Sequence, residues 1–207
     1  MTLPHGYHGI EPGDLVTVVT DFEMRARADA PLPVAMPEGA RLALPRVERS
    51  DLDAYRRLIL DVGSEYLWQA RLRLQDEELA AIVHDADVHV HVLRADGADV
   101  GIVELDFREA GACEIAFFGV TRTAQGTGAA RWAMGRALEA AWAREGVGRV
   151  WLHTCTLDHP AAPAFYRRMG FRAVRQYVEV LPDPRLTGLL PRDAAPHVPL
   201  GLGGPSE

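Results

Sequence analysis

The feature that most restricts the fold of this chain is a glycine-bearing turn between an apolar strand and a long helix. The segment from Glu114 to Gly128 reads EIAFFGVTRTAQGTG and leads into an alanine-rich helical stretch. The first N–H groups of a helix lack carbonyl partners and carry partial positive charge, so an anion can accept their hydrogen bonds. Gly126 and Gly128 lack a Cβ, which permits positive φ and close approach of a ligand. The turn is a candidate phosphate site, with an ordinary strand-to-helix turn as the alternative.

Length and composition predict one main globular domain. The 207 residues are 48% hydrophobic, which is enough for a substantial core. No apolar run approaches the ~20 residues that span a bilayer, and the N-terminus lacks the basic-then-apolar order of a signal peptide. We therefore expect a cytoplasmic protein without a membrane partner. The net charge of −7 argues against a nucleic-acid surface and favours cationic small molecules as partners.

The predicted elements run in the order strand, short strand, two helices, three antiparallel strands, helix, strand, short helix, strand. A helix crossover before the sixth strand predicts that this strand runs parallel to the fifth. We divide the chain into an N-terminal arm or sheet extension (1–40), a main domain (41–181) and an extended C-terminal tail (182–207), with 200–207 mobile. The elements cover residues 14–20, 41–46, 50–62 (with Ser50 as helix N-cap), 75–84, 88–94, 100–107, 113–120, 128–144, 149–156, 161–168 and 171–181.

Two motifs make residues 41–181 resemble the GNAT superfamily of acetyl-CoA-dependent N-acyltransferases. Gln125 to Ala130, QGTGAA, fits the family pattern Gln/Arg-x-x-Gly-x-Gly/Ala, and Ala164 to Phe171 is similar to its Tyr-x-x-x-Gly-Phe helix. The resemblance implies an α/β (α+β) fold with a mixed, mostly antiparallel central sheet. It also implies helices on both faces of the sheet and a splay between the fourth and fifth core strands.

The resemblance further implies that acetyl-CoA is the co-substrate and that the acetyl group goes directly to a primary amine in a ternary complex. The amine would belong to a small molecule or a peptide. Arg122 and Arg131 flank the turn and could meet phosphate, or be solvated surface arginines. Asp158 stands where the family often has an Asn that contacts the pantetheine, so that contact is open and a helix N-cap role is the alternative. The residues assigned to the coenzyme are Phe118, Gly119, Val120, Arg122, Gln125, Gly126, Thr127, Gly128, Ala129, Ala130 and Asp158.

Two side chains are assigned to catalysis through the resemblance. Glu114 is the candidate base, with Glu104 as its rival and a solvated strand-end carboxylate as the alternative. Strict alternation along the strand would put Glu114 on the face to which Phe118 points. Tyr166 is the candidate acid toward the leaving thiolate, since a phenol titrates near pH ~10; its alternative is a tyrosine that packs the helix on the sheet.

The remaining polar residues predict no further chemistry. Cys113 and Cys155 lie in apolar strands and are expected to be reduced and structural. No carboxylate or cysteine lies at metal-ligand spacing from His89, His91 and His153, so we expect no metal site. Two rival functions stay open: an enzyme of this fold with another acyl-CoA donor, and a catalytically silent coenzyme A-binding module. Pairing of two copies into a homodimer is also left open.

Overall fold

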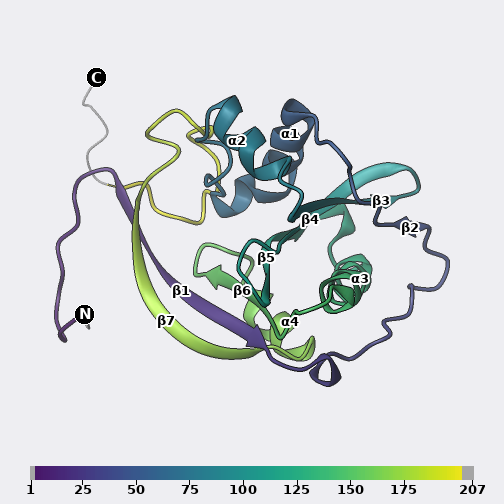
Figure 1. Cartoon of the computed structure of the whole chain (residues 1–207). Coiled ribbons are helices and arrows are strands. Elements are labelled where there is room, and N and C mark those ends of the chain that lie inside the picture. Colours follow the sequence, from purple (N-terminus) through teal and green to yellow (C-terminus); the bar gives the residue numbers. More distant parts are fainter. Residues whose placement is uncertain (1–2, 202–207) are drawn as a thin grey trace.

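A seven-stranded sheet with helices on both faces forms the protein in this computed structural model, which describes residues 3–201 (Figure 1). The strand order is β2-β3-β4-β5-β6-β1-β7. The helices are α1 (Leu52–Gly63), α2 (Asp76–Val83), α3 (Ala129–Ala143) and α4 (Ala162–Arg168). The strands are β1 (Asp14–Met24), β2 (Leu42–Ala43), β3 (Val88–Ala95), β4 (Ala98–Asp106), β5 (Ala112–Val120), β6 (Arg149–Cys155) and β7 (Arg172–Pro182).

The sheet is antiparallel except between β5 and β6, which α3 connects. Their parallel pairing covers three residues of each strand, Ala112 to Glu114 against Arg149 to Trp151. Beyond Glu114, β5 continues to Val120 without pairing to β6. The predicted mixed sheet and the splay between these two strands are therefore confirmed.

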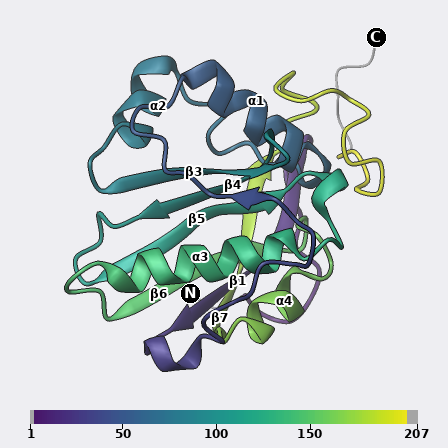
Figure 2. The ribbon, with the colours of Figure 1, turned by 90° about the vertical axis from the view of Figure 1, so that its right-hand side faces the viewer.

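The helices cover the two faces in pairs, α1 and α2 on one and α3 and α4 on the other (Figures 1 and 2). On α1 the buried residues Tyr55, Ile59 and Val62 recur at helical spacing and pack with Ile102 of β4. On the opposite face Met134 and Leu138 of α3 pack with Leu105, Leu152 and others. Within residues 3–201 no helix has the length and apolarity to cross a membrane.

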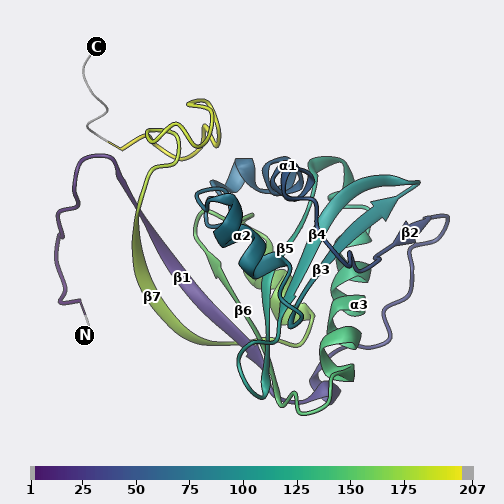
Figure 3. The ribbon, with the colours of Figure 1, turned by 45° about the horizontal axis from the view of Figure 1, so that its top comes forward.

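The N-terminal segment supplies an interior strand of the sheet. β1 lies between β6 and β7 and pairs antiparallel with both, so the sheet would be interrupted without it (Figure 3). It runs from Asp14 to Met24, beyond the predicted end at residue 20, and buries Phe22 and Met24 in the core. The division of the chain at residues 40 and 181 stays a prediction.

Two local predictions are wrong. Asp51 and not Ser50 caps α1, because the Asp51 carboxylate accepts the N–H of Ala54 at 2.7 Å. The Ser50 hydroxyl is buried without a partner among the described residues. β2 is limited to Leu42–Ala43, shorter than the predicted 41–46, since Pro45 has no N–H and joins β3 only by accepting the N–H of Val92.

The segment predicted as an extended tail folds back between residues 183 and 199 around a buried ion pair. The Arg185 guanidinium donates to both Asp183 carboxylate oxygens at 2.9 and 2.7 Å, and both side chains are almost fully buried. Its other hydrogens go to the carbonyls of Ala194, Ala195, Val198 and Pro199. A guanidinium has five N–H donors, so this one side chain can organise a whole loop. Of the residues predicted to be mobile, 202–207 lie outside the described residues.

Removing one member of this pair should strongly destabilise the protein. Arg185→Met leaves the Asp183 carboxylate buried without its cation, and we expect a loss of about 3–5 kcal/mol in the free energy of unfolding by urea denaturation. Arg192→Met changes an exposed arginine of the same loop and serves as control. A loss in Arg185→Met no larger than in the control would contradict the role of the pair.

The same pair makes a pH-dependent contribution to stability. Burial raises the pKa of Asp183, but the hydrogen bonds from Arg185 outweigh it and hold that pKa below its ordinary value. The contribution is therefore present above the ordinary aspartate pKa and is lost as pH falls through the lowered one. In Arg185→Met burial should outweigh the remaining backbone hydrogen bonds, so the pKa of Asp183 should lie above its ordinary value and the unfolding free energy should fall as pH rises from the ordinary aspartate pKa through the raised one.

Candidate active site

A bulge in β5 decides which side chains face the splay. Glu104 pairs with Phe117 while the next residue, Leu105, pairs with Ile115, so Ala116 has no partner across β4. The extra residue reverses the alternation of the side chains. Glu114 therefore lies on the same face as Phe117, toward α1 and α2, and the prediction that it shares a face with Phe118 is wrong.

A cavity of about 600 Å³ lies where β5 and β6 part. One side is formed by the free half of β5, and the opposite side by His153 and Cys155 of β6. The segment after α1 and the start of α4 close it from the two faces of the sheet. Its lining includes most of the residues assigned from the sequence: Glu114, Phe118, Gly119, Val120, Gln125, Gly126, Ala130, Asp158 and Tyr166.

The glycine turn forms one end of the cavity. Gly126 and Gly128 both have positive φ, +74° and +86°, and a Cβ on Gly128 would lie 2.9 Å from Pro37. Within residues 3–201 the N–H groups of Gly126, Thr127 and Gly128 have no acceptor. Three free N–H groups ahead of α3 make a site that can hold an anion. Four of the residues assigned to the coenzyme do not line the cavity itself: Thr127, Gly128, Ala129 and Arg122.

Arg122 and Gln125 connect the turn to the segment after α1. The Arg122 guanidinium donates to the Glu65 carboxylate at 2.8 Å and remains largely exposed. The Gln125 amide donates to the Tyr66 hydroxyl at 3.1 Å. Both contacts hold residues 64–66 against the anion site.

Glu114 faces the cavity beside a histidine. Its carboxylate lies 3.5 Å from Nδ1 of His153 on the neighbouring strand and is about a quarter exposed. The hydrogen bond to Glu114 raises the pKa of His153 above its ordinary value, against the opposing effect of burial. Asp106, opposite Glu114 on β4, is neutralised by a bidentate contact from Arg108. A half-buried carboxylate at the wall of a cavity can accept a proton from a bound amine.

Glu104, the rival base, has both oxygens occupied. The Tyr55 hydroxyl donates to one and the Arg71 guanidinium to the other, each at 2.6 Å, and Glu104 is fully buried. Burial, and then the charge of Glu104, raise the pKa of Tyr55 well above its ordinary value, so the phenol remains a donor. Glu104 lies outside the cavity lining and holds α1, β4 and Arg71 together, with Arg71 stacked over Phe117.

Tyr166 projects from α4 into a cluster of aromatic rings. It contacts Phe22, Phe165 and Phe171, and Phe165 stacks on Phe118 of β5 with ring centroids 5.7 Å apart. Pro163 stands in the first turn of α4, as the sequence predicts. Burial, with a smaller effect from the charge of Asp158, raises the pKa of Tyr166. The phenol therefore stays protonated at neutral pH and can donate its proton.

Asp158 ties the two sides of the cavity together. Its carboxylate accepts the indole N–H of Trp68 at 2.9 Å, the hydroxyl of Thr154 and the N–H of Cys155. It does not cap α4, whose N-cap is Ala161, so the proposed capping role is wrong. Trp68 packs so closely on β5 that a Cβ on Gly119 would lie 2.9 Å from its ring.

Sequence reasoning assigned no individual role in this site to Trp68, His153 or Arg71. Trp68 and Arg71 lie in an irregular segment, where no periodicity indicates which way a side chain points. For His153 a signal existed, because it alternates with Cys155 on a strand next to the candidate base. Burial raises the pKa of both Cys113 and Cys155, in keeping with inert thiols.

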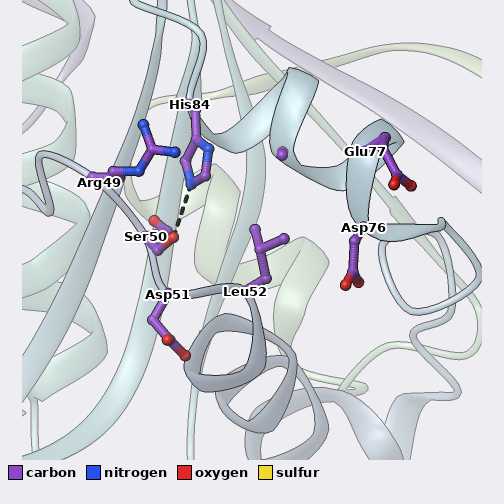
Figure 4. Close-up of a pocket in the computed structure, with 8 residues that line it drawn as sticks. Arg49, Ser50, Asp51, Leu52, Asp76, Glu77 and His84 are labelled. Carbon is purple, nitrogen blue, oxygen red and sulfur yellow. Dashed lines mark hydrogen bonds between the residues drawn. The ribbon is translucent and has the colours of Figure 1, made fainter.

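A second hollow lies between the N-terminus of α1 and the side of α2, along which it extends from Asp76 to His84 (Figure 4). It has a volume of about 580 Å³, is open to solvent and shares no lining residue with the cavity at the splay. His84 and the Ser50 carbonyl form a hydrogen bond of 2.8 Å across it. Nowhere in residues 3–201 do three or more His, Cys, Asp or Glu side chains form a group that could hold a metal ion.

Comparison with protein families identifies this arrangement. The model of the acetyltransferase (GNAT) family matches residues 52–171, more than half of the chain. The chain belongs to the GNAT acetyltransferase family. The match includes the glycine turn, Glu114 and Tyr166, and it begins after β1 and ends before β7. No protein in the curated set matches this sequence.

Solved structures show the same fold at low sequence identity. A GCN5-related N-acetyltransferase from Sphaerobacter thermophilus superposes with a TM-score of 0.61 at 21% identity, over 84% of this GNAT chain and 53% of that one. One from Kribbella flavida gives 0.54 at 18% identity, over 85% and 63%. A functionally unknown conserved protein from Staphylococcus epidermidis ATCC 12228 gives 0.56 at 16% identity, over 83% and 63%. The chain thus spans about half to two thirds of the length of these proteins.

The Glu114–His153 contact should be visible by NMR. In Glu114→Gln we expect the pKa of His153 to fall, because the carboxylate that stabilises the imidazolium is gone. In the parent protein the imidazolium persists to higher pH and loses its proton as pH rises through the raised pKa. A titration of the imidazole proton resonances measures this, with Glu145→Gln as control at an exposed glutamate. An unchanged His153 titration in Glu114→Gln would contradict the contact.

Proposed function

We propose that this GNAT-family protein transfers the acetyl group of acetyl-CoA to a primary amine by direct attack, without a covalent enzyme intermediate. The observation that carries the proposal is the cavity at the splay, which Tyr166 and Glu114 line and at whose end the glycine turn has its free N–H groups. Acyl transfer needs a held donor, a deprotonated amine and a stabilised leaving thiolate. Each of the three requirements has a residue at this cavity.

The donor would bind along the turn and the free edge of β5. The N–H groups of Gly126, Thr127 and Gly128 would donate hydrogen bonds to the pyrophosphate, with the positive end of α3 behind them. From Phe118 to Val120 the β5 backbone faces the cavity without a β6 partner, so it is free to pair with the amide groups of the pantetheine arm.

Glu114 would take the proton of the attacking amine, directly or through water. The amine nitrogen then forms a bond to the thioester carbonyl carbon, and the carbon–sulfur bond breaks with its electron pair on sulfur. Tyr166 would give its proton to that sulfur, since its raised pKa means that the phenol is protonated at neutral pH when the thiolate forms. The proton on Glu114 is released to solvent, and Tyr166 is protonated again.

The acceptor would approach from the α1 and α2 side of the sheet. The bulge at Ala116 turns Glu114 to that face, where Trp68, Phe117 and Arg71 line the cavity. A small-molecule or peptide amine fits this assignment, and acidic groups favour the approach of a cation. The cytoplasmic location stays a prediction.

Two conservative substitutions test the chemistry. Tyr166→Phe and Glu114→Gln should each lower kcat by about 10²-fold or more, because each removes one proton transfer. Acetyl-CoA consumption over a panel of polyamines, amino acids, aminoglycosides and peptide N-termini measures this, and acetyl-CoA against longer acyl-CoA donors tests the donor. Tyr7→Phe and Glu145→Gln, both exposed, are the matched controls. A parent protein that binds coenzyme A but turns over no amine would instead favour the silent binding module.

The anion site is tested by one added charge. We expect saturating acetyl-CoA, at about 100 times its Kd, to stabilise the parent protein by ~2.7 kcal/mol, and ATP to do so much less. Gly126→Asp should abolish this shift, since its carboxylate would repel the pyrophosphate. Gly126→Asn is the matched control, because a side chain there meets open space and Asn also tolerates positive φ. Equal shifts in the two variants, measured by thermal unfolding, would contradict the site.

A further inference from the structure

The last strand of the sheet is exposed on both faces and along one edge. Every residue of β7 from Arg172 to Val180 is exposed, and β1 pairs with one edge of the strand (Figures 1 and 3). In residues 3–201 no strand pairs with the other edge. Soluble proteins usually protect such edges by shortness, proline or cover. β7 has eleven residues and one proline, Pro182, at its end.

The face of β7 on the α4 side also carries uncovered apolar side chains. Val178 and Val180 are exposed by 43% and 53%, and they pair across the sheet with Val18 and Val16 of β1, which are exposed by 40% and 43%. The helix α4 lies near the opposite end of these strands, by Phe22, and leaves the four valines open (Figure 1). An exposed β-branched patch beside an open edge is typical of a surface that pairs with another chain.

We propose that the partner is a second copy of this chain, with β7 pairing antiparallel to β7 of the partner around a two-fold axis at Tyr177. In this register the numbers of two opposed residues, one from each copy, add up to twice 177. Arg175 then lies opposite Glu179 of the partner, and Glu179 opposite Arg175 of the partner. Val178 lies opposite Gln176 of the partner. The two sheets become one.

Charge selects this register over its neighbours. Opposed residues of an antiparallel pair must point to the same face, so the axis has to pass through a residue and not between two. An axis at Arg175 or Glu179 would set like charges against each other, which is unfavourable. An axis at Gln176 or Val178 would leave both charges opposite uncharged residues. Among these five centres, Tyr177 alone makes both opposite-charge contacts.

The structure positions both charges for this pairing. The Arg175 guanidinium lies 5.0 Å from the centre of the Tyr177 ring, and the Tyr177 hydroxyl donates to Asp21 at 3.2 Å. Neither Arg175 nor Glu179 has an ion-pair partner within the described part of the chain. Glu179 also lines the cavity at the splay. The dimer therefore sets Arg175 of the partner subunit beside the cavity wall.

Reversed charges test the register. We expect the parent chain to be a dimer by sedimentation velocity, and Arg175→Glu and Glu179→Arg each to raise the dimer Kd by at least about tenfold, since each sets like charges together twice. An equimolar mixture of the two variants restores both opposite-charge contacts and should form a heterodimer. Arg172→Glu, on the same strand but opposite Pro182 of the partner, is the matched control.

Several outcomes would overturn the proposal. A parent chain that stays monomeric at high protein concentration excludes the pairing, and a dimer that neither variant weakens places the interface elsewhere. If the two variants are folded by circular dichroism and monomeric but do not associate when mixed, the register is wrong. None of these measurements depends on acetyl transfer, so they stand apart from the test of the proposed function.

Discussion

The site depends on the early end of the pairing between β5 and β6. Three residue pairs join these strands, and after Glu114 the sheet divides while each strand continues with its other neighbour. An unpaired strand edge inside a domain is costly unless a ligand or solvent satisfies its polar groups. The same break thus makes a cavity and leaves the backbone of β5 available to pair with a bound molecule. The glycine turn at the end of β5 then sets the anion site at the end of that edge.

Two buried ionic groups keep the divided sheet in place. Glu104 joins α1 and Arg71 to β4 beneath one wall, and the Asp183–Arg185 pair folds the C-terminal loop. That loop packs through Leu190 and Ala195 against Leu67 and Leu157, which line the cavity. Removing one partner of a buried ionic pair leaves the other charge uncompensated, which is strongly destabilising. Glu104, Asp183 and Arg185 therefore support the cavity without lining it.

The N-terminal strand connects this site to the proposed dimer. β1 pairs with β6, which carries His153, and with β7, which carries Glu179 and forms the open edge. A long, twisted two-strand extension exposes apolar surface that helices of the domain do not reach. Pairing between copies would complete the sheet and bring the partner close to the cavity.

Local sequence patterns determined the elements of this protein, because they depend on neighbouring residues. The helical spacing on α1, the glycines before α3 and Pro163 at the start of α4 are each readable from a few positions. The resemblance to the GNAT superfamily predicted the fold, and most of the residues assigned through it line the cavity. The sequence does not reveal on which side of the sheet Glu114 lies. A single bulged residue, Ala116, reverses the alternation of side chains along β5, and this bulge depends on the register between β5 and β4. Three features join residues that are distant in the chain. They are the position of β1 between β6 and β7, the contact of Glu114 with His153, and the hydrogen bonds from Tyr55 and Arg71 to the two oxygens of Glu104. Only the tertiary structure decided them, since they follow from which segments pair and not from what each segment is.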